Sequence, residues 1–283
     1  MHRFHQLLDR FREEPGKVRF LLSRALWTTG LCRFITFGFP AGYRMRFYPS
    51  SMSAGLWRHR HFRSEDVDFV GGYLQPGETF VDVGANVGQL SLAAAMRVTP
   101  SGRVIAIEAH PRTCKYLQGN VRLNDLTIEI HNVAVGSKRG ELFFTDFRSD
   151  DMNFASATPP RGGSALRVPV QTLDSIIEER PVDLLKVDVE GFEVDLLKGA
   201  SQTISNCRCL YIEDSDLNLR RAGTSRAELY DRLIVHGFDL FHVRAGQLQP
   251  ASPQIPGPPD DNLIAIRPPE VPDLLARTGL RLS

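Results

Sequence analysis

The segment Val81–Gly88 (Val-Asp-Val-Gly-Ala-Asn-Val-Gly) constrains the fold more than any other part of the chain. It joins a β-rich run, residues 79–83, to a helical pattern over residues 87–96. Glycines at such a turn let the backbone approach a ligand, and the start of the helix offers free N–H groups. A dinucleotide-binding fold would carry Gly-x-Gly-x-x-Gly here, whereas this turn has Gly-x-x-x-Gly preceded by Asp82. The turn therefore predicts a βα unit with a different kind of ligand site.

Strands and helices alternate along the chain after this turn. Strands are expected at 79–83, 104–107, 128–130, 184–187, 209–212, 238–243 and 263–266, and helices at 87–96, 111–123, 192–198 and 226–236. This order is typical of a doubly wound α/β fold with a mostly parallel, seven-stranded sheet. About twenty residues without a helical pattern separate the last two strands, so we expect that pair to be antiparallel.

Charge divides the chain into unequal parts. The composition, 42% apolar and 24% charged residues over 283 positions, excludes a disordered chain or a coiled coil. Residues 1–63 carry a net charge of +9 and the remaining 220 residues −8, although the whole chain is close to neutral at +1. We predict a basic N-terminal extension or cap over 1–63, a main domain over 64–267 and a C-terminal tail over 268–283. A plainer interpretation is that many of the arginines are solvated or pair with the acidic body.

Local patterns predict the organisation around the main alternation. Residues 1–37 read as one or two amphipathic basic helices with a break at 14–17, and residues 43–48 as an edge strand. A helix is expected to begin at Ser64, with this serine as its cap. Residues 141–144 are expected to form a strand followed by a polar loop over 148–161, a length that is more often functional than decorative.

The chemistry of the glycine turn favours a cationic ligand. Asp82 brings a negative charge to it, which suits an ammonium or sulfonium group better than a phosphate. Glu108 follows the next strand, twenty residues after Gly88, where a carboxylate can accept both hydroxyls of a ribose. Asn132, just past the third strand, is placed to face an adenine ring.

Five ordered motifs make residues 64–267 similar to class I S-adenosylmethionine methyltransferases, and more narrowly to the FkbM family. The motifs are residues 75–88, 106–111, 132–136, 170–176 and 185–193. The resemblance implies S-adenosylmethionine as cofactor, and these cofactor-binding residues: Asp82, Gly84, Ala85, Asn86, Gly88, Glu108, Asn132 and Asp188. Asn86 stands where many class I methyltransferases have a glycine, a departure that FkbM proteins accommodate.

The candidate catalytic residues are Asp188 and Glu190, which follow the fourth strand at the carboxyl edge of the sheet. Methyl transfer to an alcohol needs a base, and we expect one of these two to serve. Other candidates in the sequence are Glu213, His110, His131, His236 and His242. A plainer role for Glu190 and Glu193 is to cap the next helix. A divalent cation held by Asp188 with Glu213 or Asp214 is a further option that we do not favour, and no zinc spacing is present.

The resemblance implies O-methylation of a saccharide or of a lipid- or polyketide-type metabolite. Two alternatives stay open, an NAD-dependent oxidoreductase and a non-catalytic scaffold with a cofactor fold. The basic N-terminus fits a substrate lid or a peripheral membrane contact, and residues 57–61, which mix an aromatic with basic groups, suit an acidic or glycan acceptor. We do not expect nucleic-acid binding, a transmembrane span or a secretory signal, and we expect a cytoplasmic protein. Nothing in the sequence points to an oligomeric state.

Overall fold

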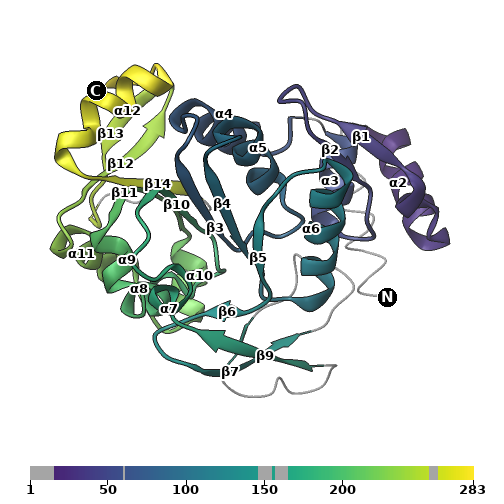
Figure 1. Ribbon diagram of the computed structural model, residues 1–283. Helices are drawn as coiled ribbons and strands as arrows, with labels where there is room; N and C mark the ends of the chain where they lie inside the picture. Colours follow the sequence, from purple (N-terminus) through teal and green to yellow (C-terminus); the bar gives the residue numbers. More distant parts are fainter. Residues whose placement is uncertain (1–15, 60, 146–154, 157–164, 255–260) are drawn as a thin grey trace.

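The computed structural model describes residues 16–59, 61–145, 155–156, 165–254 and 261–283 (Figure 1). Its main sheet has nine strands in the order β15-β13-β12-β14-β11-β10-β3-β4-β5. Their bounds are β3 Thr79–Val83, β4 Arg103–Ile107, β5 Glu129–His131, β10 Val182–Val187, β11 Cys207–Asp214, β12 Asp239–Arg244, β13 Gln247–Pro250, β14 Asp261–Ile266 and β15 Arg281–Leu282. The seven predicted strands are confirmed, and β13 and β15 extend the sheet at one edge.

Strand directions also agree with the prediction. Strands β5, β4, β3, β10 and β11 are parallel to one another. Strand β14 lies between β11 and β12 and is antiparallel to both, as expected from the missing crossover helix. The carboxyl ends of β3, β4, β10 and β11 therefore meet at one edge of the sheet, where open α/β folds bind their ligands.

Helices cover both faces of this sheet because its central strands are apolar on both sides. On one face pack α7 Leu173–Ile177, α8 Glu193–Lys198, α9 Ser201–Ser205, α10 Asp216–Arg221 and α11 Arg226–Val235. On the other pack α4 Ser64–Tyr73, α5 Gln89–Val98, α6 Pro111–Leu123 and α12 Val271–Thr278. The predicted cap is off by one residue: Ser64 is the first residue of α4, and the cap position is Arg63, with a left-handed backbone and no capping side-chain bond.

A second, four-stranded sheet is inserted between β5 and β10. It has the order β6-β9-β7-β8, with β6 Ala134–Val135, β7 Gly140–Thr145, β8 Ala155–Ser156 and β9 Ala165–Gln171. The strand expected at 141–144 is β7. Most of the polar loop expected at 148–161 lies outside the described residues, and Ala155–Ser156 from it pairs with β7.

The N-terminal part contains α2 Lys17–Thr29, η1 Leu31–Phe34, β1 Thr36–Gly38, β2 Arg44–Arg46 and α3 Ser51–Arg58. Apolar side chains from residues 32–56, including Phe47 and Leu56, share a core cluster with Leu92 of α5 and Leu117 of α6. The division at residue 63 stays a prediction, and the packing across it is extensive. The first half of the basic helices expected over 1–37 lies outside the described residues. No helix in the described parts of the chain is long and apolar enough to cross a bilayer.

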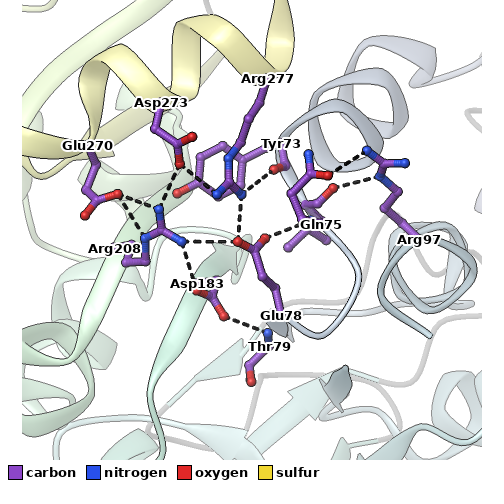
Figure 2. A network of polar contacts seen from close by, with 11 residues as sticks. Tyr73, Gln75, Glu78, Thr79, Arg97, Asp183, Arg208, Glu270, Asp273 and Arg277 are labelled. Carbon is purple, nitrogen blue, oxygen red and sulfur yellow. Dashed lines mark hydrogen bonds and ion pairs between the residues drawn. The ribbon is translucent and has the colours of Figure 1, made fainter. Parts of the chain in front are cut away.

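Ion pairs fix the C-terminal segment to the amino-terminal edge of the sheet (Figure 2). Arg208, at the start of β11, pairs with four carboxylates: Glu78, Asp183, Glu270 and Asp273. Arg277 of α12 pairs with Glu78 and Asp273 as well. This network lies at the opposite end of the strands from the predicted site, so its role is to hold α12 and η3 (Pro268–Glu270) in place.

Candidate active site

The turn after β3 has two glycines that the surrounding protein requires. Gly84 and Gly88 adopt left-handed φ angles of 78° and 92°. A Cβ on Gly84 would lie 1.8 Å from the backbone oxygen of Asp188, and one on Gly88 would lie 2.4 Å from Cδ1 of Leu117. Packing against two neighbouring segments therefore accounts for both glycines, and the glycine spacing alone does not identify a ligand.

Two buried oxygen atoms at this turn do point to a ligand. Oδ1 of Asp82 and Oδ1 of Asn86 are buried, and neither accepts a hydrogen bond from any described residue. Asp82 is 1% exposed, and its other oxygen accepts from the Ser91 hydroxyl at 2.5 Å. A pocket beside the turn is lined by both residues, by Gly84 and Ala85, and by Met52 from the N-terminal part. Buried acceptors without a hydrogen bond are rare, so these two oxygens are placed to accept from N–H groups of a ligand, in a pocket that Arg63 and Lys186 also line.

Lys186 lies beside the glycine turn and forms ion pairs with both Asp82 and Asp188. Its Nζ is 3.5 Å from Oδ1 of Asp82 and 3.4 Å from Oδ2 of Asp188, and it donates to the backbone oxygen of Gly84 at 3.0 Å. Burial alone would lower the pKa of Lys186, but the charges of Asp188 and Asp82 raise it instead. Lys186 is therefore a buried cation, and it fixes the carboxyl ends of β3 and β10 relative to each other.

Arg63 completes this charge network from outside the motifs. Its Nη2 donates to Oδ2 of Asp188 at 3.1 Å, and its Nε donates to Oδ2 of Asp66 at 2.6 Å. Burial alone would raise the pKa of Asp188, yet the charges of Lys186 and Arg63 hold it below its usual value. Arg63 also lines the pocket beside the glycine turn. In the sequence Arg63 belongs to the predicted N-terminal extension and nothing marks it as a site residue, because its distance from Asp188 depends on the fold.

Glu108 lies at the end of β4, beside the same turn, as predicted from the strand order. Its Oε2 accepts from the N–H of Asn86 and its Oε1 from the N–H of His110, both at 2.8 Å. Burial raises the pKa of Glu108 to about 7 although these two backbone donors oppose the shift. The amide nitrogen of Asn132 donates to the backbone oxygens of Glu108 and Ala109 at 2.8 and 3.0 Å. Asn132 thus fixes the loop that carries Glu108.

The acid cluster, defined as Asp188, Glu190, Glu193 and Glu213, occupies the carboxyl ends of β10 and β11. Asn218 of α10 donates to Oε2 of Glu190 at 2.9 Å and to Oε1 of Glu213 at 3.4 Å. Burial, followed by the charges of Asp188, Glu193 and Glu190, raises the pKa of Glu213 to about 9. Its Oε2 is buried and accepts no hydrogen bond from the described residues.

Glu190 has the most distinctive position in the acid cluster. Its side chain reaches solvent, and its backbone is left-handed with φ of 55°, an uncommon value for a residue with a side chain. Partial burial, together with the charge of Asp188, raises its pKa. Glu193 holds the turn by accepting the N–H groups of Val189 and Gly191, both at 3.1 Å. No side chain caps α8, so Glu193 holds the preceding turn instead of capping the helix, and Glu190 is bound by Asn218.

One carboxylate considered as a cation ligand from the sequence, Asp214, has other partners. Asp214 is fully buried and accepts from Arg226 and Tyr230, both at 2.7 Å, so each of its oxygens is already used in a separate buried network. The described residues contain no cluster of three or more metal-ligating side chains with suitable geometry.

The four histidines considered as bases have structural partners or positions. His131 contacts Glu129 at 2.8 Å, and His242 contacts Tyr230 at 3.0 Å. His110 caps α6, and His236 ends α11.

The aromatic and basic segment 57–61 is largely used in packing. Trp57 stacks on Phe47 with ring centroids 5.3 Å apart, and Arg58 lies over the Phe20 ring. Arg60 lies outside the described residues.

Comparison with known proteins bears on the same residues. The family model described as the methyltransferase FkbM domain matches residues 82–240, more than half of the chain, from Asp82 to the second residue of β12. "Methyltransferase 1" of Beauveria bassiana is 29% identical over 148 residues, which cover 44% of this chain and 59% of that protein. The hexuronic acid methyltransferase AglP of Haloferax volcanii is 25% identical over 65% of this chain and 76% of its own length. The 2-O-methyltransferase NoeI of Sinorhizobium fredii is 23% identical over 51% of this chain and 66% of its own length.

The match covers most of the site and the parallel part of the sheet, whereas Arg63 and β14 lie outside it. This chain covers less than two thirds of the length of some of these relatives, 59% for the Beauveria protein. The matched range nevertheless includes the glycine turn, Glu108 and the acid cluster. On this evidence the chain belongs to the FkbM methyltransferase domain family, and its fold is α/β with a large, mostly parallel sheet.

Proposed function

We propose that this chain is an S-adenosylmethionine-dependent O-methyltransferase that acts on a hydroxyl of a saccharide or a related polyhydroxylated metabolite. The observation that carries the proposal is the pair of buried oxygens, Asp82 Oδ1 and Asn86 Oδ1, which accept no hydrogen bond from the described residues. They lie beside a pocket whose lining also includes Arg63 and Lys186. The turn lacks the Gly-x-Gly-x-x-Gly spacing of dinucleotide-binding folds, which argues against the NAD-dependent alternative.

The charges around the pocket suit the amino-acid end of the cofactor. Asp82 and Asn86 would accept from its ammonium group, and Arg63 would pair with its carboxylate. Arg63 uses Nε for Asp66 and Nη2 for Asp188, so Nη1 lies outside these two ion pairs. Arginine binds a carboxylate through several donors in one plane, which gives this contact both strength and orientation.

Residues at the carboxyl ends of the neighbouring strands would bind the nucleoside part of the cofactor. Each oxygen of Glu108 accepts one backbone N–H and keeps a second lone pair, which would accept a ribose hydroxyl. Asn132 would sit near the adenine, with its amide nitrogen already engaged by backbone oxygens. Gly84, Ala85 and Gly88 would bring the backbone close to the ligand.

When bound, S-adenosylmethionine supplies a methyl group on a sulfonium that is already activated for displacement. The protein has to orient the acceptor hydroxyl and remove its proton. Glu190 is the strongest candidate for the base because it reaches solvent, has a raised pKa and is oriented by Asn218. Asp188 is kept ionised by Arg63 and Lys186, which makes it a weaker base and a positioning residue. Glu213, protonated at neutral pH, would donate a hydrogen bond to the acceptor.

The acceptor class rests on chemistry and on the relatives. Glu190, Glu213 and Asn218 place several hydrogen-bonding groups beside one another, and a saccharide offers matching hydroxyls. Two of the relatives, NoeI and AglP, are named as a 2-O-methyltransferase and a hexuronic acid methyltransferase, and this similarity supports a sugar-type acceptor.

The test is to incubate the chain with methyl-labelled S-adenosylmethionine and a panel of oligosaccharides, uronic acids and polyketide alcohols. The proposal predicts label in a base-stable methyl ether on a sugar hydroxyl. Label only in an amine, a carboxylate ester or a carbon position would overturn the O-methyl assignment. Cofactor binding without transfer to any acceptor would favour the scaffold alternative.

A further inference from the structure

The helix α2 and the short helix η1 expose an unusual concentration of apolar side chains. Eleven large apolar residues are exposed among those that the structure describes, and five of them fall between positions 18 and 34. They are Val18, Leu21, Leu22, Leu31 and Phe34, with Phe34 75% and Val18 71% exposed. Single exposed apolar residues are common on proteins, whereas several on one short segment point to an interaction surface.

The geometry of α2 places three of these side chains on one face. Val18, Leu21 and Leu22 have the i, i+3, i+4 spacing that puts residues on one face of a helix. The opposite face anchors the helix, since Phe20 and Ser23 are buried and the Ser23 hydroxyl lies 3.4 Å from Arg58 of α3. In Figure 1, α2 lies at the periphery of the molecule, on the far side of α3 and β1 from the main sheet. The apolar face therefore belongs to a fixed element on the outside of the protein.

The charge around this face is of one sign. Residues 16–63 contain nine lysines and arginines and no aspartate or glutamate. Lys17, Arg19, Arg24 and Arg33 belong to α2 and η1 themselves. Three of these arginines lie over aromatic rings, those of Trp57, Trp27 and Phe34, at 5.3 to 5.6 Å from the ring centroids. A partner that carries negative charge is therefore complementary to this face.

We propose that α2 and η1 form a docking surface for a bilayer of anionic phospholipids, a property that goes beyond the proposed methyl transfer. Helices that lie in the membrane interface combine an apolar face with surrounding Lys and Arg residues. The apolar side chains enter the boundary between headgroups and acyl chains, and the basic side chains meet the lipid phosphates. A nucleic acid would engage the arginines but would leave Val18, Leu21 and Phe34 in water, so the combination of features selects a lipid surface.

The test is co-sedimentation of the full chain with vesicles of phosphatidylcholine alone or mixed with phosphatidylglycerol. We expect binding to the mixed vesicles, weaker binding in high salt and little binding to phosphatidylcholine alone. The double variant Leu21→Glu/Phe34→Glu should lose at least about tenfold in vesicle affinity. The matched control is Val235→Glu, since Val235 is 84% exposed at the end of α11, and it should bind like the wild type.

Circular dichroism and cofactor affinity of each variant, measured without vesicles, separate loss of docking from loss of folding. The proposal is overturned if the wild type does not bind the mixed vesicles or if the double variant binds them equally well. It is also overturned if the wild type sediments as a dimer that the double variant dissociates, because α2 then covers a second copy of the chain. Salt-sensitive binding to a DNA or RNA duplex without vesicle binding would assign the basic surface to nucleic acid instead.

Discussion

Arg63 and Asp188 form an ion pair, with Nη2 of the arginine 3.1 Å from Oδ2 of the aspartate, although they are 125 positions apart in the chain. Arg63 immediately precedes α4, and Asp188 immediately follows β10. The pair therefore joins the basic N-terminal part to the carboxyl edge of the sheet, beside the pocket at the glycine turn. The N-terminal part is thus a structural component of the candidate site.

Replacement of Arg63 by methionine should weaken binding of S-adenosylhomocysteine by about 10- to 100-fold, the effect of losing one charge-assisted contact. Binding of 5′-methylthioadenosine, which lacks the amino-acid group, should change by less than about twofold, because Arg63 is proposed to contact only the carboxylate. Arg63→Lys should fall between the two, since lysine keeps the charge but loses the planar donors. Calorimetric titration of the three proteins with both ligands measures this difference. Equal losses for both ligands would instead assign Arg63 a purely structural role.

Cofactor affinity should rise with pH through about pH 7. Burial raises the pKa of Glu108 to about 7, so this carboxyl is protonated below that pH and ionised above it. Only the ionised form can accept two ribose hydroxyls in addition to the N–H groups of Asn86 and His110. Titrations with S-adenosylhomocysteine between about pH 6 and about pH 8 should show the rise, and Glu108→Gln should bind weakly with a flat profile. A wild-type affinity that is independent of pH in this range would contradict the assignment.

The same raised pKa predicts an opposite trend for the stability of the ligand-free protein. A folded-state pKa above the unfolded value means that the folded state takes up a proton more readily. The stability linked to Glu108 is therefore fully present below about pH 4.5 and is lost as the pH rises through about 7. Chemical denaturation of the wild type and Glu108→Gln, without ligand, should show that the difference between them grows in favour of the variant as the pH rises. A constant difference would argue that Glu108 titrates normally.

Glu190→Gln should lower kcat by about 10²- to 10⁴-fold while leaving the affinity for S-adenosylhomocysteine within about twofold of the wild type. The amide keeps the shape of the side chain but cannot take the proton of the acceptor hydroxyl. A suitable control is Glu179→Gln, because Glu179 is exposed just before β10, at the opposite edge of the sheet. If Glu190→Gln keeps full kcat, the base must be sought at Glu213 or Asp188.

The alternation of strands and helices could be read from the sequence because each element is set by local periodicity. The parallel order of the strands also predicts that Asp82, Glu108 and Asp188 lie at one edge of the sheet, since the carboxyl ends of parallel strands meet there. Adjacent residues of a strand point to opposite faces, so at most one of Glu213 and Asp214 can lie beside Asp188. Arg63 and the inserted four-stranded sheet could not be predicted, because both depend on contacts between residues far apart in the chain.

Arg208→Met should lower the free energy of unfolding by about 1–3 kcal/mol, since Asp183 and Glu270 lose their arginine while Glu78 and Asp273 keep only Arg277. The expected loss of stability is smaller than for a fully buried ion pair because the Arg208 side chain is 30% exposed. The matched control is Arg220→Met. The Arg220 side chain is 73% exposed and pairs with Asp216 one helical turn away, so this variant should lose no more than about 0.5 kcal/mol of unfolding free energy. Urea denaturation of both variants measures the contrast. Equal effects would show that the network in Figure 2 does not hold the C-terminal segment.

The most direct test of the central claim is calorimetric titration of the wild type and Asp82→Ala with S-adenosylmethionine, S-adenosylhomocysteine and NAD. We expect the wild type to bind both adenosyl ligands and not NAD. We also expect Asp82→Ala to lose at least about tenfold in affinity for both adenosyl ligands, because the buried acceptor for the ammonium group is gone. Binding of NAD without either adenosyl ligand, or an Asp82→Ala variant that binds them as tightly as the wild type, would contradict the assigned site.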